Sequence, residues 1–396
     1  MKIVSVCRVL PTPDHPAAGA FVLRRLEAMA GKAALRVIQP LPYLPIARPL
    51  PAWAHQDSHG AGQLSIEHAP MLYVPGALKW LDGRWLELAV FRRLAALRSA
   101  GALEAIDAHF GYPDGVGCVR AARRLGVPVF VTLRGMEVDA IRTRRIRPQL
   151  VRAMRGATGC ITVSHSLRDL AVEAGVDPLR ILVAPNAIDR ALFRPGDRAA
   201  ARRQLGLRQD ARLIVSVGHL IAGKGHHVLI RALASLRARR PDAKLVIIGG
   251  SAYEPDHPRE LQALVQELGL DGAVRFAGAV SPETIARWLQ AANAFALGTE
   301  REGCCNAVLE ALAVGLPVVT TPVGDNARFV ADDANGRLVA VGDAEGTALA
   351  LDRVLDRDWD HAAISRALPV GSWSDVADQV LEFMSARSRM SAGDTH

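Results

Sequence analysis

The stretch from Arg301 to Asp325, REGCCNAVLEALAVGLPVVTTPVGD, determines the local fold of the second half of the chain. A short apolar run, Ala294–Leu297, precedes it and has the composition of a buried strand. Residues 307–314 have the apolar character of a buried helix, which Gly315-Leu316-Pro317 ends, and a Val-rich run follows. A strand, a helix and a second strand in this order form a βαβ unit, the building block of a parallel sheet.

The same alternation of strand and helix patterns runs through the chain in two series. In the first series we predict strands at Ile3–Cys7, Leu35–Gln39, Ala105–His109, Val127–Leu133, Gly159–Val163 and Ile181–Ala184. In the second we predict them at Arg212–Val217, Lys244–Ile248, Val274–Ala277, Ala294–Leu297, Pro317–Thr320 and Arg337–Val339. The helices between them include Ala20–Ala30, Gly115–Leu125, Val228–Ala238, Pro258–Leu268, Pro282–Ala291 and Ala307–Val314. Two such series predict an α/β protein with two parallel sheets, each covered by helices on both faces.

The length of 396 residues also favours two domains, because a single core rarely grows that large. Turn-forming residues cluster at Pro185–Asp197, and we place the boundary there. The predicted domains are residues 1–188 and 189–372, followed by a final helix at about 373–388. Sheets of this kind bind ligands beyond the carboxyl ends of their strands, so a cleft between the two domains is the expected site.

Several protein classes are disfavoured by composition. No run of 18 apolar residues is present, and the N-terminal MKIVSVCRVLPTPDHP lacks the length and cleavage site of a signal peptide. We therefore expect a cytoplasmic protein. The five cysteines form no CxxC pair, so a disulfide framework or a zinc site is not expected. His226-His227 does not suggest a metal either, since neighbouring histidines point apart and no third ligand is evident.

The positive charge is concentrated in the first half. Residues 1–190 hold 25 Lys and Arg against 15 Asp and Glu, whereas the remainder holds 23 against 25. Six of the arginines lie between Arg142 and Arg155. Such a half suggests an anionic partner, phosphate or acidic lipid, although a merely solvated basic face is an equally good explanation. Nucleic acid is not expected, because aromatic residues make up 5% of the chain and no nucleic-acid-binding module is present.

The loop after residue 297 carries the first candidate site. A helix that begins near Asn306 presents unpaired N–H groups and a partial positive charge, which suit phosphate, and Asn306 is a candidate cap. Gly303 allows close approach of the backbone, and Glu302 and Glu310 could each accept hydrogen bonds from sugar hydroxyls. This spacing suits a nucleotide-sugar. The alternative is that Glu302 is a solvated loop acid and Glu310 simply favours the helix.

Three further positions follow predicted strands. Lys224 lies in the loop GHLIAGKG and could contact phosphate, Arg134 follows the strand that ends at Leu133, and Gly19 precedes the first helix. Lys224 could equally be a surface lysine in a turn. The Walker pattern GxxxxGK[ST] is absent, and no GxGxxG follows the first strand, so ATP hydrolysis of that type and dinucleotide dehydrogenation are disfavoured.

Taken together, these motifs resemble glycosyltransferase family 4. EGCCNAVLE, with seven residues between Glu302 and Glu310, is similar to the EX7E signature of that family, and ALAVGLPVVTTPVG resembles its continuation. GHLxxxKG at 218–225, PNAIDxxxFxP at 185–195 and Val163-Ser164 also match, in the same order. The resemblance covers about residues 1–385. Within the family the chain looks most like bacterial cell-surface polysaccharide transferases of the teichuronic-acid and exosortase-associated types.

The resemblance implies a GT-B fold, in which two Rossmann-like domains face each other across a cleft and the last helix returns to the first domain. It implies a retaining transferase that uses a nucleotide-diphosphate sugar, with no cofactor and no essential metal. Lys224 and Arg134 would then act in catalysis together with Glu302, which would contact the donor sugar. The remaining donor-binding residues implied are Gly19, His219, Val280, Gly303, Cys304, Cys305, Asn306 and Glu310. The chain departs from the family pattern at His219, where arginine is common, and at Arg134, where many members have histidine.

The expected acceptor is a glycan or a polyprenyl-linked sugar. The apolar, proline-rich residues 41–53 and the tryptophan-containing residues 71–85 could join Arg142–Arg155 in a surface that touches anionic membrane on its inner face. The alternative is that these aromatic side chains only pack the first domain. The sequence leaves two other functions open: a nucleotide-sugar epimerase or hydrolase of the same fold, and a non-catalytic anion-binding protein.

Overall fold

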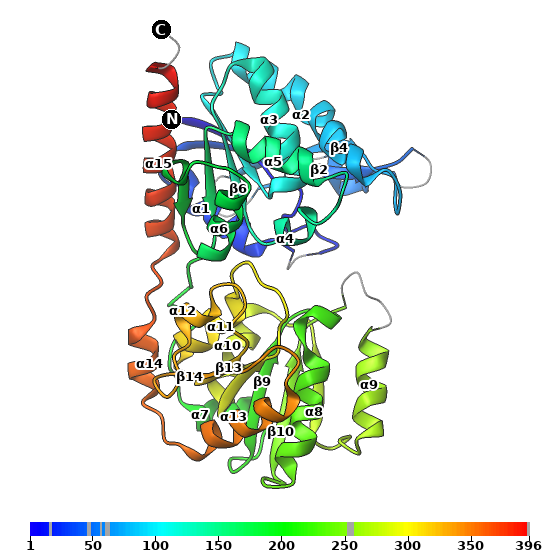
Figure 1. The fold of residues 1–396 in the computed structure, drawn as a ribbon, viewed down its shortest axis with the longest axis vertical. Helices are drawn as coiled ribbons and strands as arrows, with labels where there is room; N and C mark the ends of the chain where they lie inside the picture. Colours follow the sequence, from blue (N-terminus) through cyan, green and yellow to red (C-terminus); the bar gives the residue numbers. More distant parts are fainter. Residues whose placement is uncertain (16–17, 46–48, 56–57, 60–63, 252–256, 394–396) are drawn as a thin grey trace. The chain divides into compact units, whose positions relative to one another are not determined.

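The computed structural model describes residues 1–15, 18–45, 49–55, 58–59, 64–251 and 257–393 (Figure 1). The chain divides into two compact units: unit 1 comprises Met1–Ala187 and Gly371–His396, and unit 2 comprises Ile188–Val370. The chain thus builds most of unit 1, then all of unit 2, and returns to unit 1. No helix in the described part of the chain combines the length and apolar character needed to cross a bilayer.

Unit 1 is built on an eight-stranded sheet with the order β3-β4-β2-β1-β5-β6-β7-β8. Its strands are β1 (Lys2–Val6), β2 (Ala34–Tyr43), β3 (Ser58–His59), β4 (Ser65–Leu72), β5 (Ala105–His109), β6 (Val129–Leu133), β7 (Gly159–Thr162) and β8 (Ile181–Val183). All pairs are parallel except the short β3 against β4. The longer helices are α1 (Ala20–Ala30), α2 (Asp82–Ser99), α3 (Val116–Leu125), α5 (Arg147–Gly156), α6 (His165–Glu173) and α15 (Trp373–Gly393), and α4 (Glu137–Ala140) is one turn.

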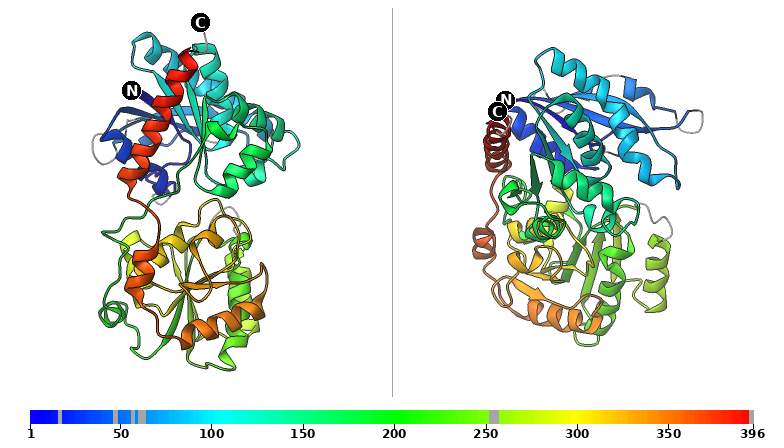
Figure 2. Two further views of the ribbon diagram at one scale, coloured as in Figure 1. Left: turned by 60° about the vertical axis from the view of Figure 1, so that its left-hand side comes forward. Right: turned by 45° about the horizontal axis from the view of Figure 1, so that its top comes forward.

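The last helix completes the core of unit 1. It lies beside α1, as Figure 2 shows, and contributes Val376, Ala377, Val380 and Met384 to a buried cluster that also contains Ile3 and Phe130. Phe383 meets Phe130 edge to face, with ring centroids 6.0 Å apart. Gly159 on β7 leaves room for this ring, because a Cβ there would lie 2.8 Å from it. Residues more than 200 positions apart therefore share one core.

Unit 2 is built on a six-stranded parallel sheet with the order β11-β10-β9-β12-β13-β14. Its strands are β9 (Arg212–Val217), β10 (Ala243–Ile248), β11 (Val274–Gly278), β12 (Ala294–Leu297), β13 (Val318–Thr320) and β14 (Gly336–Leu338). Its helices are α7 (Arg198–Gln204), α8 (His226–Arg237), α9 (His257–Glu267), α10 (Pro282–Ala291), α11 (Asn306–Val314), α12 (Asn326–Phe329), α13 (Ala344–Asp356) and α14 (His361–Ala367).

The helices of unit 2 cover both faces of its sheet. Along β9, Leu213 and Val215 pack into one cluster with α10 and α11, whereas Ile214 packs into a second cluster with α8, α9 and α13. This alternation follows from the strand period of two residues. A strand that is buried on both faces must be apolar throughout its middle, which is why the run Leu213–Val215 is easy to recognise in the sequence.

The twelve strands predicted from the sequence are confirmed, and each begins within two residues of the observed start. Neither β4 nor α2 was predicted, and each overlaps the predicted membrane segment 71–85 at one end only, β4 at residues 71–72 and α2 at residues 82–85. Trp80 and Trp85 of that segment are half-buried, in a 3-10 turn and in α2 respectively. Of the other predicted membrane segment, residues 41–53, positions 46–48 lie outside the described residues.

Candidate active site

In unit 2 the candidate residues gather where the winding of the sheet reverses. The strand order changes direction between β9 and β12, so the loops that leave the carboxyl ends of these two neighbouring strands extend in opposite directions. Ligands of open parallel sheets bind at this switch point. The loop after β9 carries Lys224, and the loop after β12 carries Glu302.

The two loops meet through an ion pair. The Lys224 ammonium lies 2.6 Å from Oε1 of Glu302, although the residues are 78 positions apart. The side chains are 23% and 9% exposed respectively, so the pair is partly reachable from solvent. The hydroxyl of Thr299, at the end of β12, lies 3.0 Å from the same carboxylate oxygen and 3.1 Å from the carbonyl of Gly223. Sequence reasoning missed Thr299, which contacts both loops.

Backbone contacts hold the loops against each other. The Glu300 N–H donates to the Gly223 carbonyl at 2.9 Å. Gly225 has φ of +67°, and a Cβ at that position would lie 1.9 Å from the Gly298 carbonyl oxygen. Only glycine fits such an approach in the left-handed region. The Lys-Gly dipeptide therefore has a physical reason: the glycine allows the contact that brings the lysine to Glu302.

Two histidines follow β9 with different roles. His219 is exposed, and partial desolvation of its ring together with the charge of Lys224 lowers its pKa, which favours the neutral imidazole. Arginine was the residue expected at this position. His226 is fully buried, with Nε2 3.4 Å from the Gly218 carbonyl and Nδ1 3.4 Å from the Ser216 hydroxyl, and burial lowers its pKa to about 4. Through these two contacts, His226 holds the start of α8 against the end of β9 and the first residue of the loop.

The amino end of α11 lies next to the Lys224–Glu302 pair. The helix begins at Asn306, and Cys305 occupies the cap position without a side-chain hydrogen bond, so the predicted cap role of Asn306 is wrong. Gly303 and Cys305 are buried and Cys304 is half-buried. Burial raises the pKa of Cys305 well above its usual value, which makes it an inert packing residue.

The remaining candidates of unit 2 flank this end of α11. Glu310 is half-buried in the second turn of the helix. Val280, after β11, is partly buried and packs against the core that contains α10 and α11. Gly324, in a segment to which we assigned no role, approaches the site closely: a Cβ there would lie 3.0 Å from the Glu302 carbonyl. Gly324 has φ of +58°. The signal in the sequence is a glycine in the turn after β13.

Unit 1 has a comparable site where its own sheet reverses, between β1 and β5. Arg8, after β1, binds the buried Asp114 through its backbone N–H at 2.8 Å and its Nε at 3.2 Å. Burial raises the pKa of Asp114 to about 6 in spite of this partner. Gly19 precedes α1 with φ of +65°, and a Cβ there would lie 2.0 Å from the Val9 carbonyl oxygen. Gly19 is therefore required by the backbone, whatever else it does.

Arg134 lies next to this switch point, just after β6, and is 8% exposed. Its Nε and one terminal nitrogen lie 3.3 and 3.2 Å from Nδ1 of His109, and its other terminal nitrogen donates to Oδ1 of Asn186 at 3.1 Å. The guanidinium carbon lies 5.3 Å from the ring centroid of Phe21, in α1. Within unit 1, the structure thus brings Arg134 close to the start of α1.

The carboxylate of Glu137 fixes the loops that carry these residues. It is fully buried and accepts backbone N–H groups from Gly111 at 2.6 Å, from Arg134 at 3.0 Å and from Gly135 at 2.8 Å. Gly111 follows β5, whereas Arg134 and Gly135 follow β6. Glu137 therefore joins two strand ends, and sequence reasoning missed it.

Comparison with known proteins assigns the chain to a family. The model for Glycosyltransferase Family 4 matches residues 57–192, and the model for Glycosyl transferases group 1 matches residues 197–367. A D-inositol 3-phosphate glycosyltransferase of Nocardioides sp. is 32% identical over 326 residues, which are 75% of this chain and 71% of the relative. The chain belongs to the glycosyltransferases. A second relative, D-inositol 3-phosphate glycosyltransferase 2 of Catenulispora acidiphila, is 30% identical over 305 residues, 72% of this chain and 71% of its own length.

Solved structures confirm the GT-B fold of this glycosyltransferase. Anabaena Alr3699/HepE in complex with UDP and glucose matches with a TM-score of 0.75 at 20% identity, over 97% of this chain and 99% of that one. Sucrose-phosphate synthase from Thermosynechococcus elongatus matches with a TM-score of 0.77 at 20% identity, over 97% and 98%. The prediction of a glycosyl-transferring enzyme is confirmed by the family, whereas the finer likeness to teichuronic-acid-type enzymes does not appear in the names of these relatives.

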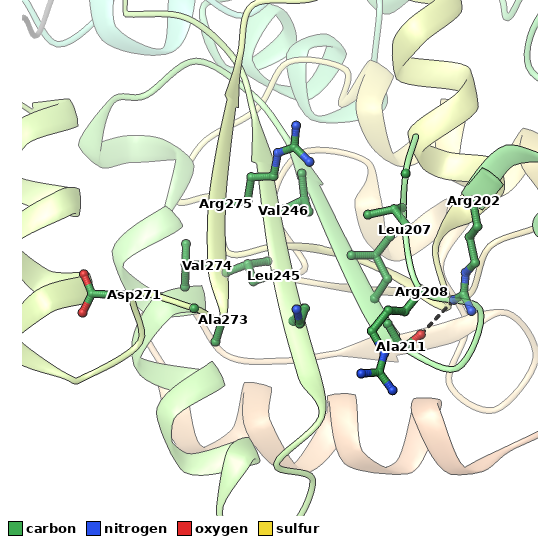
Figure 3. A pocket seen from close by; sticks show the side chains of 14 residues that line it. Arg202, Leu207, Arg208, Ala211, Leu245, Val246, Asp271, Ala273, Val274 and Arg275 are labelled. Atoms are coloured by element: carbon green, nitrogen blue, oxygen red, sulfur yellow. Dashed lines mark hydrogen bonds between the residues drawn. The ribbon is translucent and has the colours of Figure 1, made fainter. Parts of the chain in front are cut away.

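Unit 2 of the glycosyltransferase also has a cavity of about 450 Å³, whose lining side chains Figure 3 shows and which includes none of these candidate residues. Leu213, Lys244 and Val274 in its wall belong to the amino ends of β9, β10 and β11, the opposite edge of the sheet from Lys224. The buried Arg202 in its wall already donates to oxygens of Ala291, Gln209, Ala211 and Asn293. We therefore place the candidate active site at the carboxyl edge. Across the described residues, no group of three His, Cys, Asp or Glu side chains is arranged to hold a metal ion.

Proposed function

We propose that this glycosyltransferase takes its sugar from a nucleotide-diphosphate donor that binds at the carboxyl edge of the unit 2 sheet. The Lys224–Glu302 pair at the amino end of α11 is the observation that carries the proposal. Lys224 would contact the diphosphate, the positive end of the α11 dipole would lie near the same phosphates, and Glu302 would meet the donor sugar. Glu310 would accept hydrogen bonds from the ribose hydroxyls. The UDP and glucose named with the Anabaena structure support a donor of this class.

For the chemistry we propose transfer with retention of the anomeric configuration and without an essential metal or cofactor. The leaving diphosphate would be stabilised by Lys224 and by the N–H groups of the helix end, and its oxygen would take the proton of the acceptor hydroxyl as the new glycosidic bond forms. A nucleotide-sugar epimerase or hydrolase would show no dependence on an acceptor. Anomeric coupling constants in the NMR spectrum of the product distinguish retention from inversion.

The first test measures donor binding. A nucleotide-sugar at 100 times its Kd adds about 2.7 kcal/mol to the stability of the unit that binds it, so a thermal-shift screen of nucleotide-sugars identifies the donor. Lys224→Ala removes a charge-assisted contact of about 1.5–3 kcal/mol, which corresponds to roughly 10- to 150-fold weaker binding by calorimetry. Lys244→Ala is the matched control, an exposed lysine at the start of β10. Equal donor affinity in the two variants would refute the role of Lys224.

Two acceptor classes are supported by different observations. We propose a glycan or polyprenyl-linked acceptor, in the synthesis of bacterial surface polysaccharide, because unit 1 exposes a basic surface suited to anionic lipid. The names of the two relatives support instead a phosphorylated cyclic polyol such as D-inositol 3-phosphate. Radiolabelled donor incubated with each acceptor in turn separates them, since the product is either lipid-extractable or a small anionic glycoside.

The basic surface consists of six exposed arginines, Arg142, Arg144, Arg145, Arg147, Arg152 and Arg155. Arg145 stacks on Trp80 with its guanidinium carbon 4.2 Å from the ring centroid, so an aromatic side chain lies within the patch. Each arginine near an anionic membrane contributes about 1 kcal/mol at low salt. We propose peripheral binding to the inner face of the membrane through this patch.

Sedimentation with phosphatidylglycerol vesicles tests the membrane proposal. The double variant Arg144→Glu/Arg145→Glu is expected to lose binding at 50 mM salt, and the parent is expected to lose it as salt rises. The control variant Arg231→Glu/Arg259→Glu changes net charge equally on exposed positions of unit 2 and is expected to keep binding. Binding of the parent that is independent of salt, or equal loss in the two variants, contradicts the proposal.

A further inference from the structure

The Arg134 guanidinium is buried and forms no direct ion pair among the described residues. Its three contacts are with neutral acceptors, Nδ1 of His109 and Oδ1 of Asn186, and no carboxylate among the described residues forms an ion pair with it. A guanidinium has five N–H groups. With Nε and each terminal nitrogen bonded once, two N–H groups have no partner in the described part of the chain. A buried cation in this state is available to an anionic or hydroxyl-bearing ligand.

The contact with His109 fixes the protonation of that ring. Arg134 can only donate, so Nδ1 of His109 must carry the lone pair and the proton must be on Nε2. Nε2 lies 2.9 Å from Oδ2 of Asp107, which accepts this proton. Both partners therefore demand the same tautomer. His109 is fully buried, and burial lowers its pKa to about 4 even though Asp107 opposes the shift, so the ring is neutral at pH 7.

Asp107 is itself fixed by hydrogen bonds from three further side chains. Arg25 of α1 lies 3.3 Å from both of its carboxylate oxygens, and the Ser5 hydroxyl donates to it at 3.1 Å. The hydroxyl of Thr132 lies 3.4 Å away and also accepts from Arg25 at 3.1 Å. The carboxylate is therefore anchored to β1, β6 and α1, and its orientation cannot change without breaking several buried contacts.

We propose that His109 is a positioning residue for Arg134: the buried chain Asp107–His109–Arg134 fixes the guanidinium for contact with a ligand of unit 1, the acceptor. This inference rests on the proposed sugar transfer and on the ligand-contacting role that the resemblance to the family implies for Arg134. A planar guanidinium whose Nε and terminal nitrogen share one acceptor cannot rotate about its last bonds. The imidazole thus fixes the direction of the two remaining N–H groups, which a lysine or an unsupported arginine would not do.

Paired variants distinguish positioning from simple support of the fold. His109→Leu removes the acceptor for Arg134, and we expect kcat to fall about 10- to 100-fold, as for other supporting contacts of reactive groups, with the KM of the donor changed less than threefold. His109→Gln offers an oxygen to Arg134 and an amide N–H to Asp107, and we expect it to recover kcat to within about fivefold of the parent. In an Arg134→Ala background, His109→Leu is expected to add less than about a threefold loss.

Additive losses in the double variant would overturn the proposal, and so would equal losses in His109→Leu and His109→Gln. A second readout does not depend on catalysis. In protein labelled with ¹⁵N-histidine, the signal that disappears in His109→Gln should show protonated Nε2 and unprotonated Nδ1. The opposite tautomer, or a charged ring at pH 7, refutes the chain itself. The expected tautomer without any sugar transfer would instead mean that the proposed function, and not the geometry, is wrong.

Discussion

Replacing Glu137 by glutamine tests how much one buried carboxylate contributes to unit 1. The carboxylate accepts three backbone N–H groups, at 2.6, 3.0 and 2.8 Å. Glutamine keeps one acceptor oxygen and turns an NH2 group toward a backbone donor, so at least one charge-assisted bond of about 1.5–3 kcal/mol is lost. For a unit of about 200 residues, each kcal/mol lowers Tm by about 2–4 °C, and we expect a decrease of about 4–10 °C for the transition of unit 1.

Differential scanning calorimetry on the full chain measures this change. The control is Glu173→Gln, which alters the same functional group at an exposed position of α6 and is expected to shift Tm by less than 1 °C. Glu137→Ala leaves all three donors without the carboxylate and is expected to cost more than the glutamine variant. A Glu137→Gln protein that melts with the parent would show that the three N–H groups find other acceptors, and that Glu137 does not join the two strand ends.

The other predictions concern the backbone of the donor site and the buried histidines. Gly225→Ala forces a Cβ against the Gly298 carbonyl at positive φ, so we expect both a lower Tm and weaker donor binding, whereas Gly272→Ala, which has open space around it, is expected to behave as the parent in calorimetry. Burial lowers the pKa of His109 and of His226 to about 4. The folded state therefore binds fewer protons than the unfolded state between about pH 4 and 6.5, and stability is full above 6.5 and falls by up to about 3 kcal/mol per histidine as pH drops to 4. Urea denaturation across this range should show a shallower pH dependence in His109→Gln and in His226→Gln; an unchanged slope would contradict the assignment.

The strands of the sheets were predictable because they are buried on both faces. Runs such as Leu213–Val215 must be apolar, and tertiary packing agrees with local propensity. The elements within residues 65–99, β4 and α2, were not predicted, because local pattern and tertiary packing do not agree there. β4 contains a proline and three charged or polar side chains, SIEHAPML, so its alternation is broken, and its place next to β2 is set by pairing that the sequence does not display.

For the site, the types of residue were predictable and their partners were not. A lysine after β9 and an acid after β12 suggest phosphate and sugar binding, but only the order of strands in the sheet brings Lys224 to Glu302. The buried Asp107–His109 contact in unit 1, by contrast, is indicated by the sequence. Asp107 and His109 are two residues apart in an otherwise apolar strand, so they share one face, and two polar side chains buried on one face require each other as partners.

The return of α15 to unit 1 has a consequence for how the protein is made. Phe130 and Ile161 emerge from the ribosome more than 200 residues before the α15 side chains that share their core. Until α15 has been synthesised, this part of the unit 1 core lacks those side chains, while the residues of unit 2 are already present. Emergence of α15, rather than completion of the first 187 residues, is therefore the moment at which unit 1 acquires its full stability.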